Sequence, residues 1–142
     1  MKEAFRGEFY QKVDSKARVS IPAAFRRILE AEDPQAIEGA RHRVYMVYGG
    51  KSRTFVECYS RAGADALAEK IEAMELGSPE RDRAERDLIS RSVMVEIEPD
   101  GRIVLPAKVR AKMGFDVDEV AGEAAFAGFT NRRSEERRVG KE

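Results

Sequence analysis

The chain has 142 residues, of which 42% are apolar and 37% charged, and its 26 basic and 26 acidic side chains leave no formal net charge. This length suits one domain, or two small halves that share one core. The balanced charge argues against a chain that holds nucleic acid through its overall charge, and no apolar run approaches the roughly 20 residues of a membrane span.

The start of the chain and its single cysteine point to a reducing compartment. The first ten residues contain no apolar run typical of a signal peptide. Cys58 is the only cysteine, so no disulfide can form within the chain. We therefore expect a cytoplasmic protein.

Basic side chains are concentrated near the N-terminus. Residues 1–28 hold seven basic groups against three acidic ones, a local charge of +4. Electrostatic fields act locally, within a Debye length of about 8–10 Å. A chain that is neutral overall can therefore still present a basic face.

The first part of the chain predicts a strand, a turn, a second strand and a helix. Apolar residues alternate with polar ones over residues 5–13, residues 14–17 form the turn, and residues 18–21 include two β-branched side chains. Pro22 suits the first position of a helix, and the helix that follows has one apolar face formed by Phe25, Ile28 and Leu29.

The middle of the chain predicts a hairpin followed by two helices. Strands are expected at residues 44–48 and 54–58, joined by a Gly49-Gly50 turn. Apolar spacing predicts a helix over 61–76, ended by Gly77, and a second helix through Ile89 that begins at Ser78-Pro79. We expect these helices to close the core between the two ends of the chain; a role in a subunit interface is the alternative.

The last part repeats the first. It predicts a strand over residues 93–98, a turn at 99–101, a strand over 103–105 and a helix that Pro106 opens and Gly114 ends as a left-handed cap. Residues 118–131 are rich in alanine and glycine, and they have room for one more strand.

Two stretches of the sequence are closely similar. VDSKARVSIPAAFR (13–26) and IEPDGRIVLPAKVR (97–110) align with an offset of 84 positions. Four aligned pairs are identical and four more keep their chemical type; the identical pairs are Arg18/Arg102, Pro22/Pro106, Ala23/Ala107 and Arg26/Arg110. A unit of about 20 residues cannot bury its own apolar face. We therefore predict a duplication whose halves share one barrel-like core, in a mainly β fold with helices (α+β).

Each turn carries an acid four residues before an arginine. The pairs are Asp14 with Arg18 and Glu98 with Arg102. Across a tight turn the acid can fix the guanidinium group, which can then contact phosphates or a base edge. The alternative is an ion pair that only stabilises the turn.

The sequence offers little for catalysis. His42 and Cys58 are the only residues of their kinds, so one chain cannot form a Cys/His metal site. No glycine-rich phosphate loop and no G-x-S-x-G motif is present. We predict no enzyme activity, no cofactor, no metal and no small-molecule substrate.

The motifs FRGEFY, D-x-K-x-R-V-x-I-P-A-x-F-R and G-R-I-x-L-P, over roughly residues 4–131, resemble those of the MraZ family of bacterial transcriptional regulators. The resemblance implies an AbrB-like swapped-hairpin fold, a homo-oligomeric closed ring, and repression from repeated DNA boxes upstream of the division and cell-wall gene cluster. It places the two DNA-binding motifs of the family on Asp14–Arg18 and Glu98–Arg102.

The expected DNA contacts follow from this resemblance. Arg18 and Arg102 would contact double-stranded DNA with help from Lys16 and Arg6, while Asp14 and Glu98 orient the two arginines. Two positions depart from the family pattern. Ala17 stands where glycine is usual, and Glu98 stands where aspartate is usual. An alanine with positive φ would cost about 1 kcal/mol.

These arguments give a division of the chain. We expect a first AbrB-like half at 1–59, connecting helices at 60–91, a second half at 92–132, and a tail at 133–142. The tail resembles translated sequencing adapter, so we expect the natural chain to continue past Asn131 or Arg132 with a strand that completes the second half, in place of these ten residues. We predict a nucleoid-associated DNA-binding regulator; the alternatives are an antitoxin-type interaction module and a purely ring-forming assembly protein.

Overall fold

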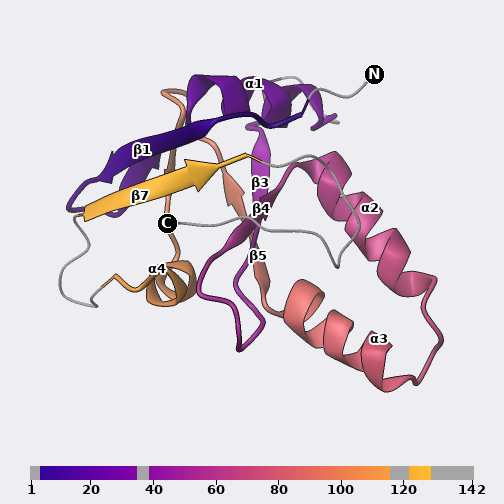
Figure 1. Ribbon diagram of the computed structural model, residues 1–142. Helices are drawn as coiled ribbons and strands as arrows, with labels where there is room; N and C mark the ends of the chain where they lie inside the picture. The colour runs from indigo at the N-terminus through magenta and orange to yellow at the C-terminus, as the bar shows by residue number, and fades with distance from the viewer. Residues whose placement is uncertain (1–3, 35–38, 116–121, 129–142) are drawn as a thin grey trace.

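The computed structural model describes residues 4–34, 39–115 and 122–128 (Figure 1). Within these ranges strands and helices follow the predicted order. They are β1 (Glu8–Val13), β2 (Arg18–Ser20), α1 (Ala23–Ala31), β3 (Arg43–Val47), β4 (Glu57–Tyr59), α2 (Arg61–Glu72), α3 (Pro79–Ala84), the π-helical segment η1 (Glu85–Ser90), β5 (Ser92–Glu96), β6 (Arg102–Val104), α4 (Ala107–Met113) and β7 (Gly122–Ala127). The expected tail at 133–142 lies outside the described residues, as do residues 129–132 before it.

The strands form two antiparallel sheets, and those in the described ranges do not close into a barrel. One sheet has the order β6-β2-β1-β7 and the other has the order β4-β3-β5. The expected barrel-like closure is not formed: within the described ranges, β5 is not paired with β6, and β4 is not paired with β7. The Ile97 N–H donates to His42 O, next to the first residue pair of β5 with β3. The described residues combine helices with two antiparallel sheets, so the fold is mixed α/β rather than mainly β.

The sequence repeat has a direct counterpart in the pairing of β2 with β6. Val19 pairs with Ile103, the residue 84 positions later, and Arg18 and Ser20 pair with Val104 and Arg102 around it. Two hydrogen bonds flank these pairs with the same symmetry: Leu105 N donates to Ala17 O at 2.9 Å, and Ile21 N donates to Gly101 O at 3.0 Å. An approximate two-fold axis therefore passes through this pair of strands.

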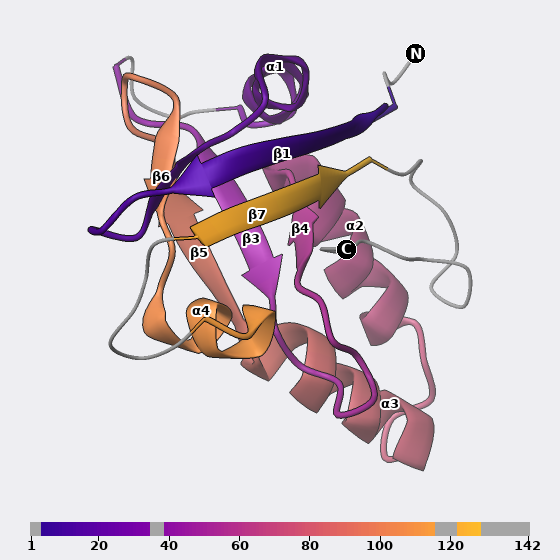
Figure 2. The ribbon, with the colours of Figure 1, turned by 60° about the vertical axis from the view of Figure 1, so that its left-hand side comes forward.

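The outer strands follow the same approximate symmetry. The first strand of each half pairs with a strand of the other half: β1 with β7 and β5 with β3. Glu8 lies opposite Ala127, and Ser92, 84 positions after Glu8, lies opposite Val47. Figure 2 shows β1 and β7 side by side, with α1 on one side of them and α4 on the other. Neither half builds its sheet alone.

The apolar core joins the two halves. Strand alternation turns Val19 and Ile103 inward, where each is 1% exposed, and the helices add Phe25 and Val109. Phe25 packs edge-on against the rings of Phe5 and Phe9, with ring centroids 5.3 Å away in both cases. The remaining buried members of this cluster are Val13, Ala17, Ile21, Leu29, Val44, Met46, Val56, Ile97, Leu105 and Ala124.

The helix boundaries follow local chemistry. Pro22 and Pro106 stand at the N-caps of α1 and α4 rather than inside the helices. The N-cap hydroxyls of Ser60 and Ser78 accept hydrogen bonds from Gly63 N and Arg81 N. Gly114 ends α4 with φ 89°, the left-handed cap expected there.

The hairpin expected around Gly49 is a longer loop in the structure. β4 begins at Glu57 rather than near residue 54. Before it, the chain meets the end of η1, where Tyr48 N donates to Arg91 O. A Cβ atom on Gly49 would lie 2.1 Å from Asp87 O, so only glycine allows this approach. The loop turns at Gly50, whose carbonyl accepts from Arg53 N.

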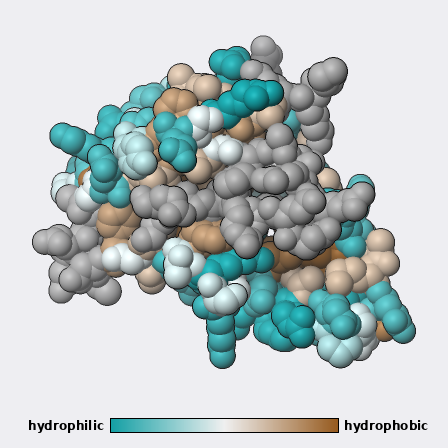
Figure 3. All heavy atoms as spheres, in the orientation of Figure 1, coloured by the Kyte–Doolittle hydropathy of each residue, from teal (hydrophilic) through white to brown (hydrophobic). Residues whose placement is uncertain are grey.

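We expected the helices α2, α3 and η1 to close the core between the halves, but they do not. They pack on the other face of the β4-β3-β5 sheet and form a second apolar cluster of Val47, Tyr59, Leu67, Ile71 and Leu88. β3 and β4 have apolar side chains on both faces, which allows each sheet face its own core. On the face shown in Figure 3, many hydrophilic residues lie at the α3 end, with a hydrophobic patch beside them. No helix in the described ranges is both long and apolar enough to cross a membrane.

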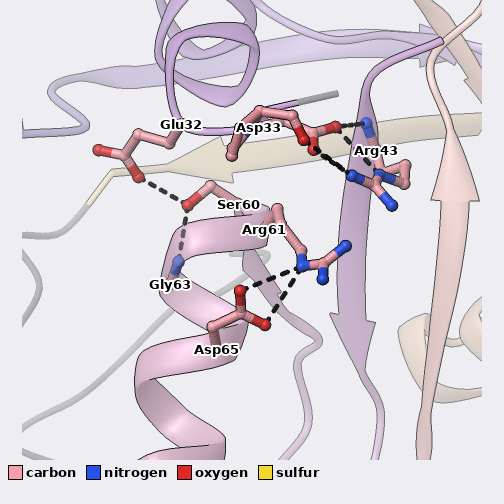
Figure 4. A network of polar contacts seen from close by, with 8 residues as sticks. Glu32, Asp33, Arg43, Ser60, Arg61, Gly63 and Asp65 are labelled. Atoms are coloured by element: carbon pink, nitrogen blue, oxygen red, sulfur yellow. Dashed lines mark hydrogen bonds and ion pairs between the residues drawn. The ribbon is translucent and has the colours of Figure 1, made fainter. Parts of the chain in front are cut away.

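A buried carboxylate links α1 to β3 (Figure 4). The Asp33 side chain is fully buried and accepts hydrogen bonds from Arg43 N at 2.8 Å, Arg43 Nε at 3.2 Å and Arg43 Nη2 at 2.5 Å. Nearby, Ser60 Oγ donates to Glu32 at 2.6 Å, which joins α1 to the start of α2. These contacts fix the end of α1 against both later elements.

Candidate nucleic-acid interface

The first turn holds its arginine through one aspartate. Asp14 Oδ1 accepts hydrogen bonds from Lys16 N at 2.9 Å and Arg18 N at 2.8 Å, while Asp14 Oδ2 accepts from Arg18 Nε at 2.9 Å. The contact expected between Asp14 and Arg18 is therefore present. It fixes the guanidinium group at its Nε edge, so its terminal nitrogens can reach outward.

The second turn holds its arginine differently. Asp100, not Glu98, forms the ion pair: Oδ2 accepts from Arg102 Nε at 2.9 Å and Oδ1 accepts from Arg102 N at 3.1 Å. Glu98 contributes backbone hydrogen bonds, donating N–H to Arg102 O and accepting from Gly101 N. The expectation that the Glu98 side chain holds Arg102 thus differs from the contacts observed. Aspartate often bonds the backbone two residues on, and this signal was available in the sequence.

Both turns need a left-handed residue at the same position. Ala17 has φ 63° and Gly101 has φ 86°. The requirement suspected from the sequence at position 17 is therefore real, and alanine meets it at a cost of about 1 kcal/mol. The methyl group is buried in the core, which offsets part of that cost.

The two arginines form a single cluster. Arg102 Nη1 lies 3.6 Å from Asp14 Oδ2, the same oxygen that accepts from Arg18 Nε. Both arginine side chains remain about one third exposed, at 34% and 36%. The repeat therefore does not create two separated basic sites within one chain; it brings two arginines to one place.

Hydrogen bonding keeps both aspartates ionised. The backbone N–H of Arg18 is the largest influence on Asp14, and together with the Arg18 side chain it lowers the pKa of that carboxyl. The backbone N–H of Arg102 acts first on Asp100 in the same way, and the pKa of Asp100 is also lowered. Both ion pairs are therefore present at neutral pH.

Lys16 and Arg6 occupy different places. Lys16 is exposed in the first turn, where its backbone N–H donates to Asp14. Arg6 is exposed before the start of β1, whereas the turn follows the end of β1. At about 3.3 Å per residue along a strand, the length of β1 separates Arg6 from the cluster.

Arg26 is a supporting residue that the sequence reading did not assign. Its Nη2 donates to Pro99 O at 3.2 Å and its Nε donates to Glu30 at 2.8 Å, so α1 braces the second turn. The equivalent Arg110 instead donates to Leu105 O. The sequence did offer one indication of this role, because arginine occupies this position in both copies of the repeat.

The other candidate groups are the metal-ligating side chains and the single thiol. These ranges contain no group of three or more His, Cys, Asp or Glu side chains that could hold a metal ion. Burial, with a smaller effect from the neighbouring Glu57 charge, raises the pKa of the Cys58 thiol to about 12. Cys58 is therefore a protonated thiol at neutral pH.

Known proteins similar to this chain are transcriptional regulators. No family model matches the chain. A protein of Cereibacter sphaeroides described as "Transcriptional regulator MraZ" is 51% identical over 134 residues, covering 93% of this chain and 79% of the relative. Proteins with the same description from Ruegeria pomeroyi and Rhodospirillum rubrum are 45% identical over 116 residues and 31% identical over 127 residues, with 82% and 88% of this chain and 70% and 74% of each relative covered.

The similarity to the Cereibacter sphaeroides protein extends across both copies of the repeat. The descriptions of these relatives define a class, the transcriptional regulators. The chain belongs to the MraZ family, as the sequence motifs had indicated.

Proposed function

We propose that this protein is a sequence-specific DNA-binding regulator of transcription, and that it acts as a repressor. Its targets would be repeated boxes upstream of the division and cell-wall gene cluster. Arg18 and Arg102 would contact the DNA, with Lys16 adding charge at the same place and Arg6 contacting phosphate further along the duplex. Asp14 would orient both arginines; Asp100 would take the role first given to Glu98.

The observation that carries this proposal is the exposed pair of arginines around Asp14. Each guanidinium group is fixed at Nε and about one third of each side chain is exposed. A guanidinium group held in this way can donate two parallel hydrogen bonds to a guanine edge or to a phosphate. A turn stabilised by an ion pair alone would not need two such groups in contact with one carboxylate.

The proposed assembly is a homo-oligomeric ring of swapped-hairpin subunits. The exchange of outer strands between residues 1–59 and residues 92–132 supports this fold. One chain presents one arginine cluster, so a single subunit would read one box. Several subunits in a ring would engage several repeated boxes, with a gain in effective concentration. Such a protein would act in the cytoplasm, at the nucleoid.

The test is a gel-shift series with DNA from upstream of the protein's own gene. Wild type and Arg18→Ala/Arg102→Ala are compared, with light scattering after size-exclusion chromatography for both. The proposal predicts that the double variant keeps its oligomeric state and loses the shift. Wild-type binding should also weaken with salt, with log K falling by about 0.9 per phosphate neutralised.

Two other results would redirect the proposal. A sound wild-type oligomer that shifts no DNA would favour a ring-forming assembly protein. A protein partner that displaces DNA or replaces it would favour an antitoxin-type interaction module. In either case the arginine cluster would be a structural feature of the turns.

A further inference from the structure

The strands β2 and β6 present an outward face of four side chains. Val19 and Ile103 point into the core, so their neighbours along each strand point outward. Arg18 lies opposite Val104, and Ser20 lies opposite Arg102. The two arginines thus occupy diagonal corners of this face, and Ser20 and Val104 occupy the other two.

This outward face breaks the approximate two-fold symmetry that its backbone obeys. The offset of 84 positions that relates Arg18 to Arg102 also relates Ser20 to Val104. One strand therefore carries a hydroxyl group where the other carries two methyl groups. Val104 is 43% exposed, so its two methyl groups are accessible on this face.

The two turns break the symmetry in the same sense. Lys16 in the first turn corresponds to Asp100 in the second. The turn next to the strand with Ser20 is thus basic, while the turn next to the strand with Val104 carries an additional acid that is paired with Arg102. Negative phosphate groups would approach the first turn more closely than the second.

We propose that β2 and β6 enter the major groove as a two-stranded ribbon and read a box that is not palindromic, with Val104 contacting a thymine methyl group and Ser20 bonding to a base edge. The major groove admits such a ribbon, and an apolar side chain there recognises the thymine methyl group. Charge complementarity selects duplex DNA as the occupant, since both arginines lie on this face. The inference rests on the proposed DNA binding and adds to it the residues that set sequence and direction.

The first experiment selects binding sites from a duplex library with a randomised segment of about two helical turns. Wild-type protein is predicted to select a box without two-fold symmetry. Val104→Ser gives both strands the same outward Arg-x-Ser pattern, so it should select a box with more symmetric central positions. Identical boxes for wild type and Val104→Ser would overturn the assignment of Val104.

The second experiment replaces each thymine of the selected duplex by uracil, which lacks only the methyl group. Loss of one methyl contact should weaken wild-type binding about fourfold at one position. Val104→Ser should lose this sensitivity, and Val104→Ile, which keeps an apolar side chain, should retain it. A wild-type profile that is flat at every thymine would overturn the contact.

Controls separate this inference from the proposed function. Ser20→Ala should relax selection at a different base from Val104→Ser, and thermal unfolding should show that these exposed substitutions leave the fold intact. If Arg18→Ala/Arg102→Ala abolishes binding but Val104→Ser and Ser20→Ala change neither box nor affinity, the inference fails while DNA binding stands. If Val104→Ser changes the oligomeric state instead of the selected box, Val104 belongs to a subunit contact and the inference is wrong. If wild type selects no DNA, both proposals fail.

Discussion

Arg102 Nη1 lies 3.6 Å from Oδ2 of Asp14, a residue from the other copy of the sequence repeat. The same oxygen accepts a hydrogen bond from Arg18 Nε at 2.9 Å. One carboxylate therefore connects two arginines that are far apart in the sequence. The pairing of β2 with β6 brings them together, because it places the ends of the two turns beside each other.

Asp14→Asn should weaken DNA binding about tenfold. This is about the effect of losing one bidentate contact between an arginine and a base. The amide can still accept from the turn backbone but no longer pairs with either guanidinium group. Simple charge repulsion predicts the opposite sign, since the substitution removes a negative charge near DNA. Fluorescence anisotropy with a labelled duplex measures the difference.

The matched control for this prediction lies in the second turn. Because Asp100 and not Glu98 pairs with Arg102, Asp100→Asn should weaken binding while Glu98→Gln leaves it unchanged or slightly stronger. If Glu98→Gln weakened binding as much as Asp100→Asn does, the observed pairing would not be the one used on DNA.

Glycine and alanine should behave differently in the two turns. Gly101→Ala puts a methyl group at φ 86° and 2.6 Å from Arg26 Nη1, so it should destabilise the protein by about 1–2 kcal/mol. Ala17→Gly relieves about 1 kcal/mol of backbone strain but loses a buried methyl group of similar value, so its net effect should be within about 0.5 kcal/mol of zero. Urea unfolding of both variants tests the contrast; equal effects would contradict it.

Asp33→Asn should lower the free energy of unfolding by about 2 kcal/mol at pH 7, because Arg43 loses its charged partner in a buried site. Burial acts to raise the pKa of Asp33, but the hydrogen bonds from Arg43 outweigh it and the pKa is lowered. A lowered pKa gives stability that is complete above the unfolded value of 3.8 and is lost as the pH falls through the folded value.

The comparison of wild type with Asp33→Asn at pH 7 and near pH 3 checks this sign, since the gap between the two proteins should shrink in acid. Asp65→Asn is the control. Asp65 pairs with Arg61 on an exposed helix face, where such a pair contributes about 0.5 kcal/mol or less. A gap for Asp33→Asn that grows in acid would contradict the argument.

Cys58 should resist a thiol reagent such as DTNB in the folded protein at pH 8. Its pKa is raised to about 12, so the reactive thiolate is scarce. Reaction should become rapid when the protein is unfolded in denaturant. Rapid labelling of the native protein would contradict the raised pKa of this thiol.

Much of the fold could be predicted because local signals and the repeat agree. Pro22 and Pro106 mark two helix starts, Gly114 marks a helix end, and the offset of 84 positions anticipates the pairing of Val19 with Ile103. Sheet closure could not be predicted, because it depends on long-range strand pairing that no local signal specifies. The position of the central helices was also out of reach, since the apolar residues of β3 leave both faces of its sheet available.

The sequence predicted the two arginines of the candidate site, but it predicted only some of the residues that support them. The spacing of Asp14 and Arg18 across a tight turn was sufficient to predict their contact. The same spacing favoured Glu98 in the second turn, where a shorter aspartate two residues before Arg102 competes successfully for the guanidinium group. The contact between Asp14 and Arg102 depends on strand register and has no local signal in either turn.

The central claim is that Arg18 and Arg102 act on DNA as one cluster. A double-mutant cycle measures this directly, with the affinities of wild type, Arg18→Ala, Arg102→Ala and the double variant for one duplex containing a single box. The account predicts non-additive losses, with a coupling free energy of at least about 0.5 kcal/mol, because both residues share Asp14. Losses that add independently would show two separate contacts and would contradict the account.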